Sequence, residues 1–334
     1  MKFLRNIFIV FVPFYFVGTW LRNRLYDWGL FSSKSFSVPL ICVGNLNVGG
    51  TGKSPMIEFL IRLLKDDWRL ATLSRGYKRT SRGFVLADEN ANHQSIGDEP
   101  YQFFTKFDSI DVAVDSNRIR GIECLLSKPH PPEVVLLDDA FQHRKVKAGL
   151  NILLTAYDDL YIDDMLLPTG NLREPKSGAA RADIILVTKC PPDMTQDEKG
   201  VIESRLSINS YQDIFFSTIS YSDMIYQQGA SQPVEALRNG SFTLVTGIAS
   251  AKPLVIYLKG LGLDFNHLEY PDHYNFSEKE IHHFDSMDMV LTTEKDYVRM
   301  KNYLKTDCVW YLPIEMEIDK TSDFRKAIEA FITS

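Results

Sequence analysis

Short apolar runs alternate with segments of helical periodicity along the first two thirds of the chain. Residues 38–43 form an apolar run typical of a buried strand, and a glycine-rich turn separates it from residues 56–64, whose apolar positions recur at helical spacing. Further strands are predicted at 69–73, 112–114, 134–137, 152–154 and 184–187, with helices at 100–107 and 117–126. Strands and helices that alternate in this way predict a mostly parallel sheet with helices on both faces.

A second, smaller α/β unit is predicted between two extended segments, 214–220 and 310–318. Its strands are expected at 242–245, around 268 and at 289–292, and its helices at 253–261 and 277–284. Two such segments can pair and act as a hinge. The predicted division is an N-terminal helix (1–31), a core domain (32–220), a smaller lobe (221–308), and a return strand with a closing helix (309–334).

The first thirty residues differ from the rest of the chain. Residues 7–21 are uncharged and rich in aromatic side chains, but the run is shorter than the about twenty apolar residues that span a bilayer, and Pro13 interrupts it. No small-residue cleavage site follows, as a signal peptide would require. Residues 1–34 carry a net charge of +4, from Lys2, Arg5, Arg22, Arg24 and Lys34 against Asp27. This pattern predicts a helix in the interface of an anionic leaflet, with a buried core helix as the alternative.

Composition narrows the function classes. The chain has 334 residues and a formal net charge of −6, which argues against general nucleic-acid binding because that needs a basic face. This length predicts one large domain and a smaller one. The cysteines are far apart and form no CxxC pair, so buried thiols are expected rather than disulfides or a zinc site. They are Cys42, Cys124, Cys190 and Cys308.

The turn after the first strand has the composition of a phosphate-binding loop. A P-loop lies between a strand and a helix, where backbone N–H groups and the helix N-terminus bind phosphates, a lysine offsets their charge and a hydroxyl holds Mg²⁺. The residues in question are Asn47, Val48, Gly49, Gly50, Thr51, Gly52, Lys53 and Ser54. Asn47 replaces the first glycine of the usual pattern, a change that asparagine tolerates because it adopts left-handed conformations readily. The alternative is a glycine-rich turn that happens to contain lysine.

An apolar strand at 134–137 ends in Asp138 and Asp139, which is typical of a Walker B segment that holds Mg²⁺ beside the loop. Paired acids at a loop can also be merely solvated. Gln142 and His143 follow and add polar groups at the same edge.

For the other candidate site residues, the local sequence gives weaker evidence of a functional role. Asp98 begins a helix and could be only its N-cap, and His273 is a lone histidine in a loop. Tyr77 and Arg173 lie in polar loops after strands and are possible substrate contacts. Residues 293–296 (TEKD) are similar to a short guanine-reading pattern that has many accidental matches.

In combination, these segments resemble the tetraacyldisaccharide 4′-kinase family, the lipid A 4′-kinases of Gram-negative bacteria. The resemblance covers nearly the whole chain and rests on the apolar N-terminal helix with VGNLNVGGTGKSP, LSRGYKR, GDEP, LLDDAFQHR, PTGNLREP, VTK, PDHYNF and TTEKD. It implies transfer of the γ-phosphate of ATP, with Mg²⁺, to the 4′-hydroxyl of a tetraacylated glucosamine disaccharide 1-phosphate at the cytoplasmic face of the inner membrane. It also implies two α/β domains joined by a two-stranded linker, with the site in the cleft between them. No nucleic acid or protein partner is implied.

The resemblance also implies roles for individual residues. Lys53 and Ser54 would hold phosphates and metal, and Asp138, Asp139 and Glu99 would serve the Mg²⁺ and nucleotide. Asp98 would accept the sugar hydroxyl proton, supported by His273 as a dyad. The substrate contacts would be Tyr77, Arg173, Glu174, Gln142 and His143. Ser54 stands where many members have threonine, which also offers a hydroxyl.

Three alternatives remain open at this point. A P-loop GTPase or metal-insertion chaperone would account for the TEKD and VTK segments. A soluble small-molecule sugar kinase would make the apolar N-terminus accidental. A non-catalytic membrane adaptor is disfavoured, because the phosphate loop, the acidic strand end and GDEP are all intact.

Overall fold

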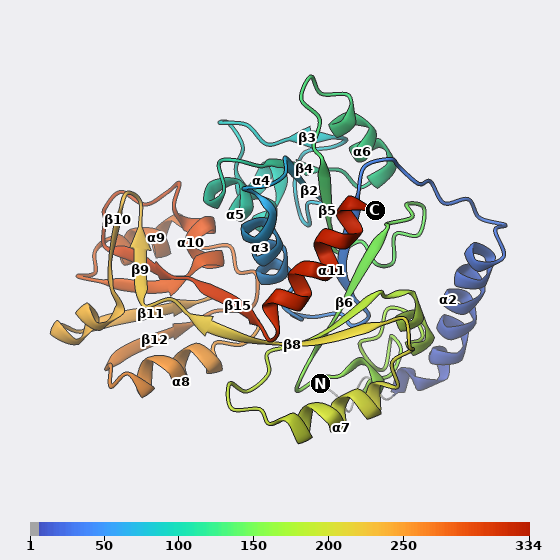
Figure 1. Ribbon diagram of the computed structural model, residues 1–334. Coiled ribbons are helices and arrows are strands. Elements are labelled where there is room, and N and C mark those ends of the chain that lie inside the picture. Colours follow the sequence, from blue (N-terminus) through green and yellow to red (C-terminus); the bar gives the residue numbers. More distant parts are fainter. Residues whose placement is uncertain (1–6) are drawn as a thin grey trace.

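The computed structural model describes residues 7–334, apart from the side chain of Asn239, and the chain forms two α/β lobes (Figure 1). Lys2 and Arg5, counted above in the basic N-terminal charge, lie outside the described residues. The larger lobe contains a nine-stranded sheet and the smaller lobe a six-stranded sheet. The predicted α/β class is confirmed.

The larger sheet has the order β15-β8-β7-β6-β1-β5-β2-β4-β3 and is parallel between β8 and β4. Only the edge strands β15 and β3 run antiparallel to their neighbours. The strands are β1 (Leu40–Asn45), β2 (Leu70–Ser74), β3 (Val85–Leu86), β4 (Asp111–Val114), β5 (Val134–Asp138), β6 (Leu150–Ala156), β7 (Ile184–Thr188), β8 (Asp213–Tyr221) and β15 (Ile314–Ile318). β1 lies between β5 and β6, with Cys42 level with Leu137 and Asn151, and all of its residues are buried. Its uninterrupted apolar run fits a strand covered on both faces.

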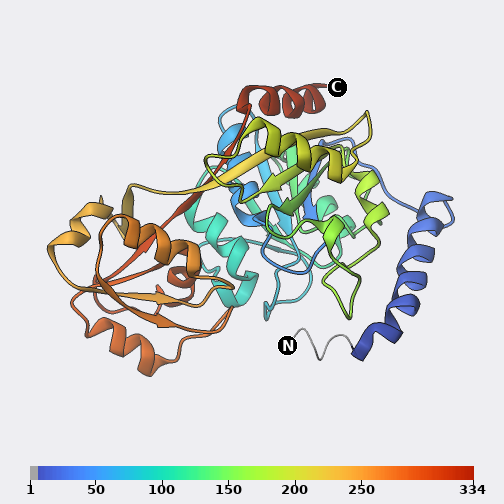
Figure 2. The ribbon, with the colours of Figure 1, turned by 90° about the horizontal axis from the view of Figure 1, so that it is seen from below.

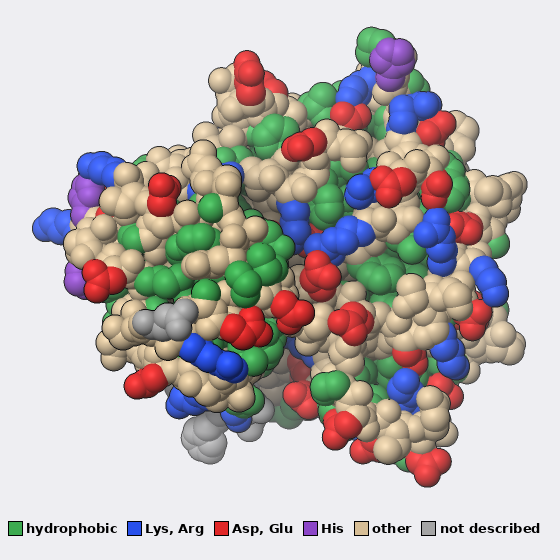
Figure 3. Space-filling model, turned by 60° about the vertical axis from the view of Figure 1, so that its left-hand side comes forward, with side chains coloured by type: hydrophobic (Ala, Val, Ile, Leu, Met, Phe, Trp, Pro, Cys, Tyr) green, Lys and Arg blue, Asp and Glu red, His purple; other side chains and the backbone are tan. Residues whose placement is uncertain are grey.

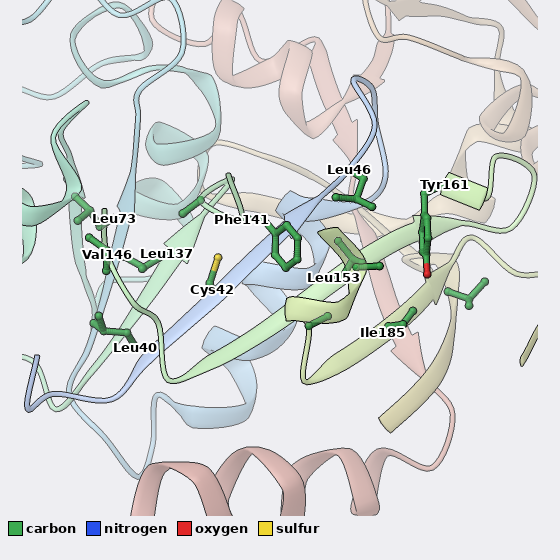
Figure 4. Packing of buried hydrophobic residues seen from close by; sticks show 14 of the residues in the cluster. Leu40, Cys42, Leu46, Leu73, Leu137, Phe141, Val146, Leu153, Tyr161 and Ile185 are labelled. Carbon is green, nitrogen blue, oxygen red and sulfur yellow. The ribbon is translucent and has the colours of Figure 1, made fainter. Parts of the chain in front are cut away.

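Helices cover both faces of this sheet. One face packs against α6 (Arg118–Leu126), α7 (Gln196–Leu206) and the 3-10 turn η3 (Lys176–Arg181). The other face packs against α3 (Lys53–Leu64), α5 (Asp98–Lys106) and α11 (Thr321–Thr333). Figure 4 shows part of the first cluster, in which Phe141 lies over β1. A Cβ at Gly44 would lie 2.6 Å from Phe141 Cβ, so this glycine allows the chain after β5 to approach β1 closely.

The smaller sheet has the order β10-β9-β14-β13-β11-β12. Its strands are β9 (Met224–Gln227), β10 (Ala230–Pro233), β11 (Phe242–Thr246), β12 (Phe265–Glu269), β13 (Val290–Thr293) and β14 (Val309–Leu312). Its helices are α8 (Lys252–Gly260), α9 (Glu278–Asp285) and α10 (Glu294–Met300), preceded by the turn η4 (Val234–Asn239). The β9–β10 hairpin and α10 were not predicted.

Two strands connect the lobes, as expected. β8 and β15 pair antiparallel, with Ser217 level with Ile318 and Tyr221 level with Ile314. The segment expected as one extended run at 310–318 is two strands in different sheets: β14 belongs to the smaller sheet and β15 to the larger. Pro313 separates them, and a proline cannot donate to a strand ladder. Residues 309–312, assigned above to the return segment, therefore lie in the smaller sheet.

The N-terminal segment forms η1 (Ile7–Phe11) and α2 (Val12–Asp27) and stands against the outside of the larger lobe, on the side away from the smaller lobe (Figures 1 and 2). No residue of α2 is fully buried, and Phe14 is 76% exposed, so α2 is not the buried core helix of the alternative interpretation. Within residues 7–334, no helix has both the length and the apolar character needed to cross a bilayer.

The remaining features of the fold are the distribution of surface charge, the burial of the cysteines and two short elements. On the face drawn in Figure 3, basic and acidic side chains lie beside one another around the middle of the molecule. All four cysteines are free; Cys42 and Cys190 are buried as expected, whereas Cys124 and Cys308 are only partly buried. The remaining short elements are α4 (His93–Ile96) and η2 (Tyr161–Asp163).

Candidate active site

The phosphate loop links the end of β1 to the start of α3. Gly52 is the N-cap of α3 with φ 88°, and Gly49 has φ 140°, both conformations that favour glycine. Thr188 at the end of β7 donates to the carbonyl of Thr51 at 2.8 Å, and the N–H of Val48 donates to the carbonyl of Asn171 at 2.7 Å. The loop is thus held at the carboxyl edge of the parallel strands, where α/β sheets bind ligands.

Lys53 lies within a small charged cluster at this edge. Its Nζ donates to Asn45 Oδ1 at 3.3 Å and lies 3.6 Å from Asp139 Oδ1. Arg173 pairs with the same carboxylate at 2.9 Å and also contacts Asn45. Burial alone would raise the pKa of Asp139, but Lys53 and Arg173 outweigh it and hold the pKa below its usual value. Asp139 is therefore ionised and shared by two cations.

Asp138, one residue earlier, is in a different environment. Its carboxylate is buried, and Oδ1 has no hydrogen-bond partner among the described residues. Burial, followed by the nearby charge of Asp139, raises the pKa of Asp138 to about 7. An unpaired buried carboxylate oxygen beside a second acid is a position that a divalent cation would stabilise. The residues present therefore fit Mg²⁺, with the buried Ser54 on the neighbouring loop supplying a hydroxyl.

The described residues contain no cluster of three or more His, Cys, Asp or Glu side chains arranged to hold a metal by themselves. The expected ligand Glu99 instead pairs with Lys295 of α10 at 3.0 Å. Burial would raise the pKa of Glu99, but Lys295 outweighs it and lowers the pKa. The charge of Glu99 still acts on Asp138, which places GDEP near the acidic end of β5.

A second cluster gathers where the two lobes meet. His273 Nδ1 lies 3.4 Å from Asp98 Oδ2, and the ring of Tyr77 meets the ring of His273 edge-on with centroids 6.1 Å apart. Asp98 is not the N-cap of α5: Gly97 takes that position with φ 96°, and the Asp98 side chain points to Arg299 at 2.8 Å. Contacts with His273 and Arg299 outweigh burial and lower the pKa of Asp98 to about 2. Three residues suggested by separate motifs thus come together.

A third group connects the site to the N-terminal helix. Gln142 donates to the carbonyl of Asn45 at 2.8 Å and to Glu174 at 2.9 Å, and Glu174 also accepts from Asn23 of α2 at 2.8 Å. Tyr15 of α2 donates to the carbonyl of Arg173 at 2.8 Å. Expected substrate contacts are thus tied to α2, and Glu174 is buried and already bonded.

His143 is neutral in this setting. Its Nε2 is buried without a partner among the described residues. Burial, with help from the charges of Arg118 and Lys145, lowers the pKa of His143 to about 4. It can therefore offer a hydrogen bond rather than a positive charge at neutral pH.

The TEKD segment is not a base-reading loop. Thr293 is the N-cap of α10 and bonds to Asp296 at 2.7 Å. Asp296 is fully buried and bonded to Arg299 at 2.8 Å and to the N–H of Gly247 at 2.9 Å. Its carboxylate is thus engaged inside the smaller lobe.

Sequence reasoning missed several residues that the fold brings to this edge. They are Asn45, Arg118, Lys189, Lys295 and Arg299. Asn45, Lys189 and Lys295 lie inside segments already singled out, so their positions at strand ends were the available signal. Arg118 and Arg299 carry no such signal, since each lies within a helix and acts through distant partners.

The comparisons with known proteins agree with this geometry. The sequence model of the family described as LpxK, tetraacyldisaccharide-1-P 4′-kinase, matches residues 4–333. A tetraacyldisaccharide 4′-kinase from Flavobacterium johnsoniae is 50% identical over 318 residues, covering 94% of this chain and 93% of that protein. One from Bacteroides thetaiotaomicron is 47% identical over 322 residues, covering 89% and 85%.

A solved structure has the same fold. The crystal structure described as the "apo" form of LpxK from Aquifex aeolicus in complex with ATP superposes with a TM-score of 0.82 at 30% identity, covering 98% of this chain and 99% of that one. The resemblance seen in the sequence motifs is confirmed by matches over the full length. The chain belongs to the tetraacyldisaccharide 4′-kinase family.

Proposed function

We propose that this chain transfers the γ-phosphate of ATP to the 4′-hydroxyl of a tetraacylated glucosamine disaccharide 1-phosphate, with Asp98 as the base. Family membership makes it a tetraacyldisaccharide 4′-kinase of lipid A biosynthesis, EC 2.7.1.130. The observation that supports the assigned roles is the convergence of the phosphate loop, the end of β5 and the Asp98 cluster. β1, β5 and β2 are neighbours in the sheet, and the loops after them meet at one edge.

ATP would be held by the loop from Asn47 to Ser54, with Lys53 against its phosphates. Ser54, Asp138 and Asp139 would hold Mg²⁺, which neutralises charge on the phosphates when bound. Lys53 and Arg173 already neutralise Asp139, and both could move to the phosphates as nucleotide enters. Glu99 could join the metal only by leaving Lys295.

Asp98 is suited to orient the acceptor and take its proton. With a pKa of about 2 it is ionised at neutral pH and accepts a hydrogen bond from the sugar hydroxyl. As the hydroxyl oxygen bonds to the γ-phosphorus, the bond from that phosphorus to the β,γ-bridging oxygen breaks, ADP leaves and the proton passes to Asp98. Positioning and charge neutralisation supply most of the rate in such transfers.

We also propose that residues 1–31, 32–220, 221–308 and 309–334 act as anchor, kinase core, smaller lobe and return segment, with the first four residues of the return segment forming β14 of the smaller sheet. The catalytic pair is split between lobes, since Asp98 belongs to the larger and His273 to the smaller. Relative motion of the lobes would then assemble the site around bound substrate, which limits wasteful hydrolysis of ATP.

The N-terminal helix would place the enzyme on the cytoplasmic face of the bacterial inner membrane as a peripheral, monotopic protein. Large apolar side chains of η1 and α2 are exposed, among them Val10, Phe11, Phe14 and Val17. An exposed apolar surface of this kind marks an interaction site, and the substrate is itself a membrane lipid.

The test is a phosphotransfer assay with γ-labelled ATP, the tetraacyldisaccharide 1-phosphate and detergent. We expect a labelled lipid with ATP and Mg²⁺, and loss of the product with the Lys53→Met variant. Turnover that prefers GTP, or that proceeds on a water-soluble sugar without lipid, would overturn the proposal in favour of the switch protein or the soluble kinase.

A further inference from the structure

Arg299 occupies the centre of the cluster where the lobes meet. Its side chain is 2% exposed and extends from α10 of the smaller lobe. Nε donates to Asp98 Oδ2 at 2.8 Å, and one terminal nitrogen lies 3.0 Å from His273 Nδ1. The other terminal nitrogen donates to Asp296 at 2.8 Å and to the carbonyl of Gly247 at 3.2 Å. One guanidinium therefore contacts both members of the proposed catalytic pair.

These contacts determine which ring nitrogen of His273 carries the proton. A guanidinium only donates hydrogen bonds, so His273 Nδ1 must accept, and the proton of the neutral ring must be on Nε2. Nδ1 also lies 3.4 Å from Asp98 Oδ2, and in this tautomer both of these atoms are acceptors. Arg299 makes the shorter contact with each residue, at 2.8 Å to Asp98 and 3.0 Å to His273.

We infer that Arg299 is a positioning residue that joins Asp98 to His273 across the lobe boundary and holds His273 in its Nε2–H tautomer. This inference rests on the roles proposed above for Asp98 and His273. It leaves Nε2–H of His273 free to donate to a bound ligand. It also leaves Asp98 Oδ1, which has no hydrogen-bond partner among the described residues, free to accept from the sugar hydroxyl.

Hydrogen bonds within the smaller lobe fix the position of the Arg299 side chain. Asp296 accepts from Arg299 through Oδ1, while its Oδ2 accepts from the Gly247 N–H and from Thr293. The carbonyl of Gly247 in turn accepts from the backbone N–H of His273 at 3.0 Å. The arginine and the histidine therefore share one support, and His273 itself has φ 57°, an uncommon conformation for a non-glycine residue.

Lysine could not replace this arginine. The lysine ammonium is a compact charge at the end of a flexible stem, whereas the planar guanidinium donates hydrogen bonds to several acceptors in fixed directions. Arg299→Lys should keep a positive charge near Asp98 and Asp296 but lose the contact that assigns the His273 tautomer. This variant therefore separates charge from positioning.

The direct test is nitrogen NMR of the full chain with ¹⁵N-labelled histidine, the His273 signals being identified by their loss in His273→Asn. We expect an unprotonated Nδ1 and a protonated Nε2 in the intact protein, and loss of that preference in Arg299→Lys. A protonated Nδ1 in the intact protein would overturn the inference. This readout does not depend on turnover, so failure of the proposed function would be seen separately, as absence of labelled lipid.

A kinetic comparison of Arg299 variants is the second test of the inference. We expect kcat of Arg299→Lys to fall roughly 10–100-fold, the scale of a 1 Å misplacement, while KM for ATP stays within about twofold. Lys106→Met removes another, partly buried cation that bridges the lobes through Glu58 and Glu294, and serves as the matched control that keeps kcat and the tautomer. Arg299→Gln, which removes the positive charge, is a second variant. If it fails to fold because Asp296 is left unpaired, the double variant Asp296→Asn with Arg299→Gln takes its place, since it removes both charges. A folded Arg299 variant with unchanged kcat would overturn the inference.

Discussion

Neighbouring carboxylates in this site have opposite ionisation behaviour because their partners differ. Asp139 shares two cations and keeps a low pKa, while Asp138, buried with an unpaired oxygen, has its pKa raised to about 7. Asp98 is again different, since its contacts with His273 and Arg299 lower the pKa to about 2. Residue type alone says little here, because burial and neighbours set the protonation state.

At the residue scale, the role of Asp98 can be measured directly. We expect Asp98→Ala to lower kcat by about 10²–10⁴, the usual contribution of a general base. Asp111→Asn is a matched control. Asp111 is the first residue of β4, at the end of the strand away from the carboxyl edge where the site lies, and it pairs only with Lys128 among the described residues. Near-normal turnover of Asp98→Ala in the labelled-phosphate assay would remove Asp98 from the chemistry.

His143 should make stability sensitive to acid. Its pKa is about 4 in the folded chain and near 6.5 when unfolded, so between these values the unfolded state binds more protons. Stability is therefore lost as the pH falls from 6.5 towards 4. We expect His143→Gln to lessen that loss in denaturant titrations at several pH values. Parallel pH curves for variant and wild type would contradict this.

At the scale of single elements, α2 combines an exposed apolar surface with polar contacts to the loops that carry the candidate substrate contacts. Tyr15 and Asn23 bond to Arg173 and Glu174, and Arg22 donates to the carbonyl of Gln142 at 2.8 Å. A helix that would meet the membrane is thus also fastened to loops expected to contact the substrate. If α2 meets the membrane as proposed, this single helix would couple membrane contact to the geometry of the proposed substrate site.

An acidic side chain on the exposed apolar surface of α2 should weaken membrane binding. We expect Phe14→Glu to reduce cosedimentation with anionic vesicles by about tenfold or more, because burying a phenylalanine contributes about 1.5–3 kcal/mol. Ile256→Glu on α8 is the matched control, because Ile256 is also exposed, at 60%. Equal binding of both variants would place the membrane contact on another surface.

At the scale of the whole molecule, three ion pairs of lysine or arginine cross between the lobes among the described residues. Lys106 pairs with Glu294 at 2.8 Å, Glu99 with Lys295 at 3.0 Å and Asp98 with Arg299 at 2.8 Å. All the smaller-lobe partners lie on α10, and all the larger-lobe partners lie on α5. These two helices therefore form an ion-paired contact between the lobes.

Nucleotide should stabilise the whole chain. A ligand at one hundred times its Kd adds about 2.7 kcal/mol to the free energy of unfolding. We expect ATP with Mg²⁺ to raise the Tm in calorimetry and Lys53→Met to abolish most of that rise. Lys65→Met, at the other end of α3, should respond to ATP like the wild type. An equal rise in Lys53→Met would argue against the loop as the phosphate site.

Much of the fold and half of the site could be predicted from local pattern. The apolar runs of β1 and β5, the helical spacing of α3 and the glycines between them determine where a phosphate loop and an acidic strand end must lie. These features depend on neighbours in sequence, so they are visible without coordinates. The pairing of β8 with β15 was also predictable, because two extended segments flank the smaller lobe.

The tertiary structure decided what depends on partners far apart in the chain. Pro313 divides a run that looked continuous, and only pairing shows that β14 and β15 belong to different sheets. Asp98 looked like a helix cap, yet its side chain meets Arg299, 201 positions later. Sequence by itself determined the local elements and the chemistry at their ends, since backbone geometry and hydrophobic spacing are short-range. The tertiary structure alone determined which charges share a partner, because burial and pairing arise only when the lobes pack.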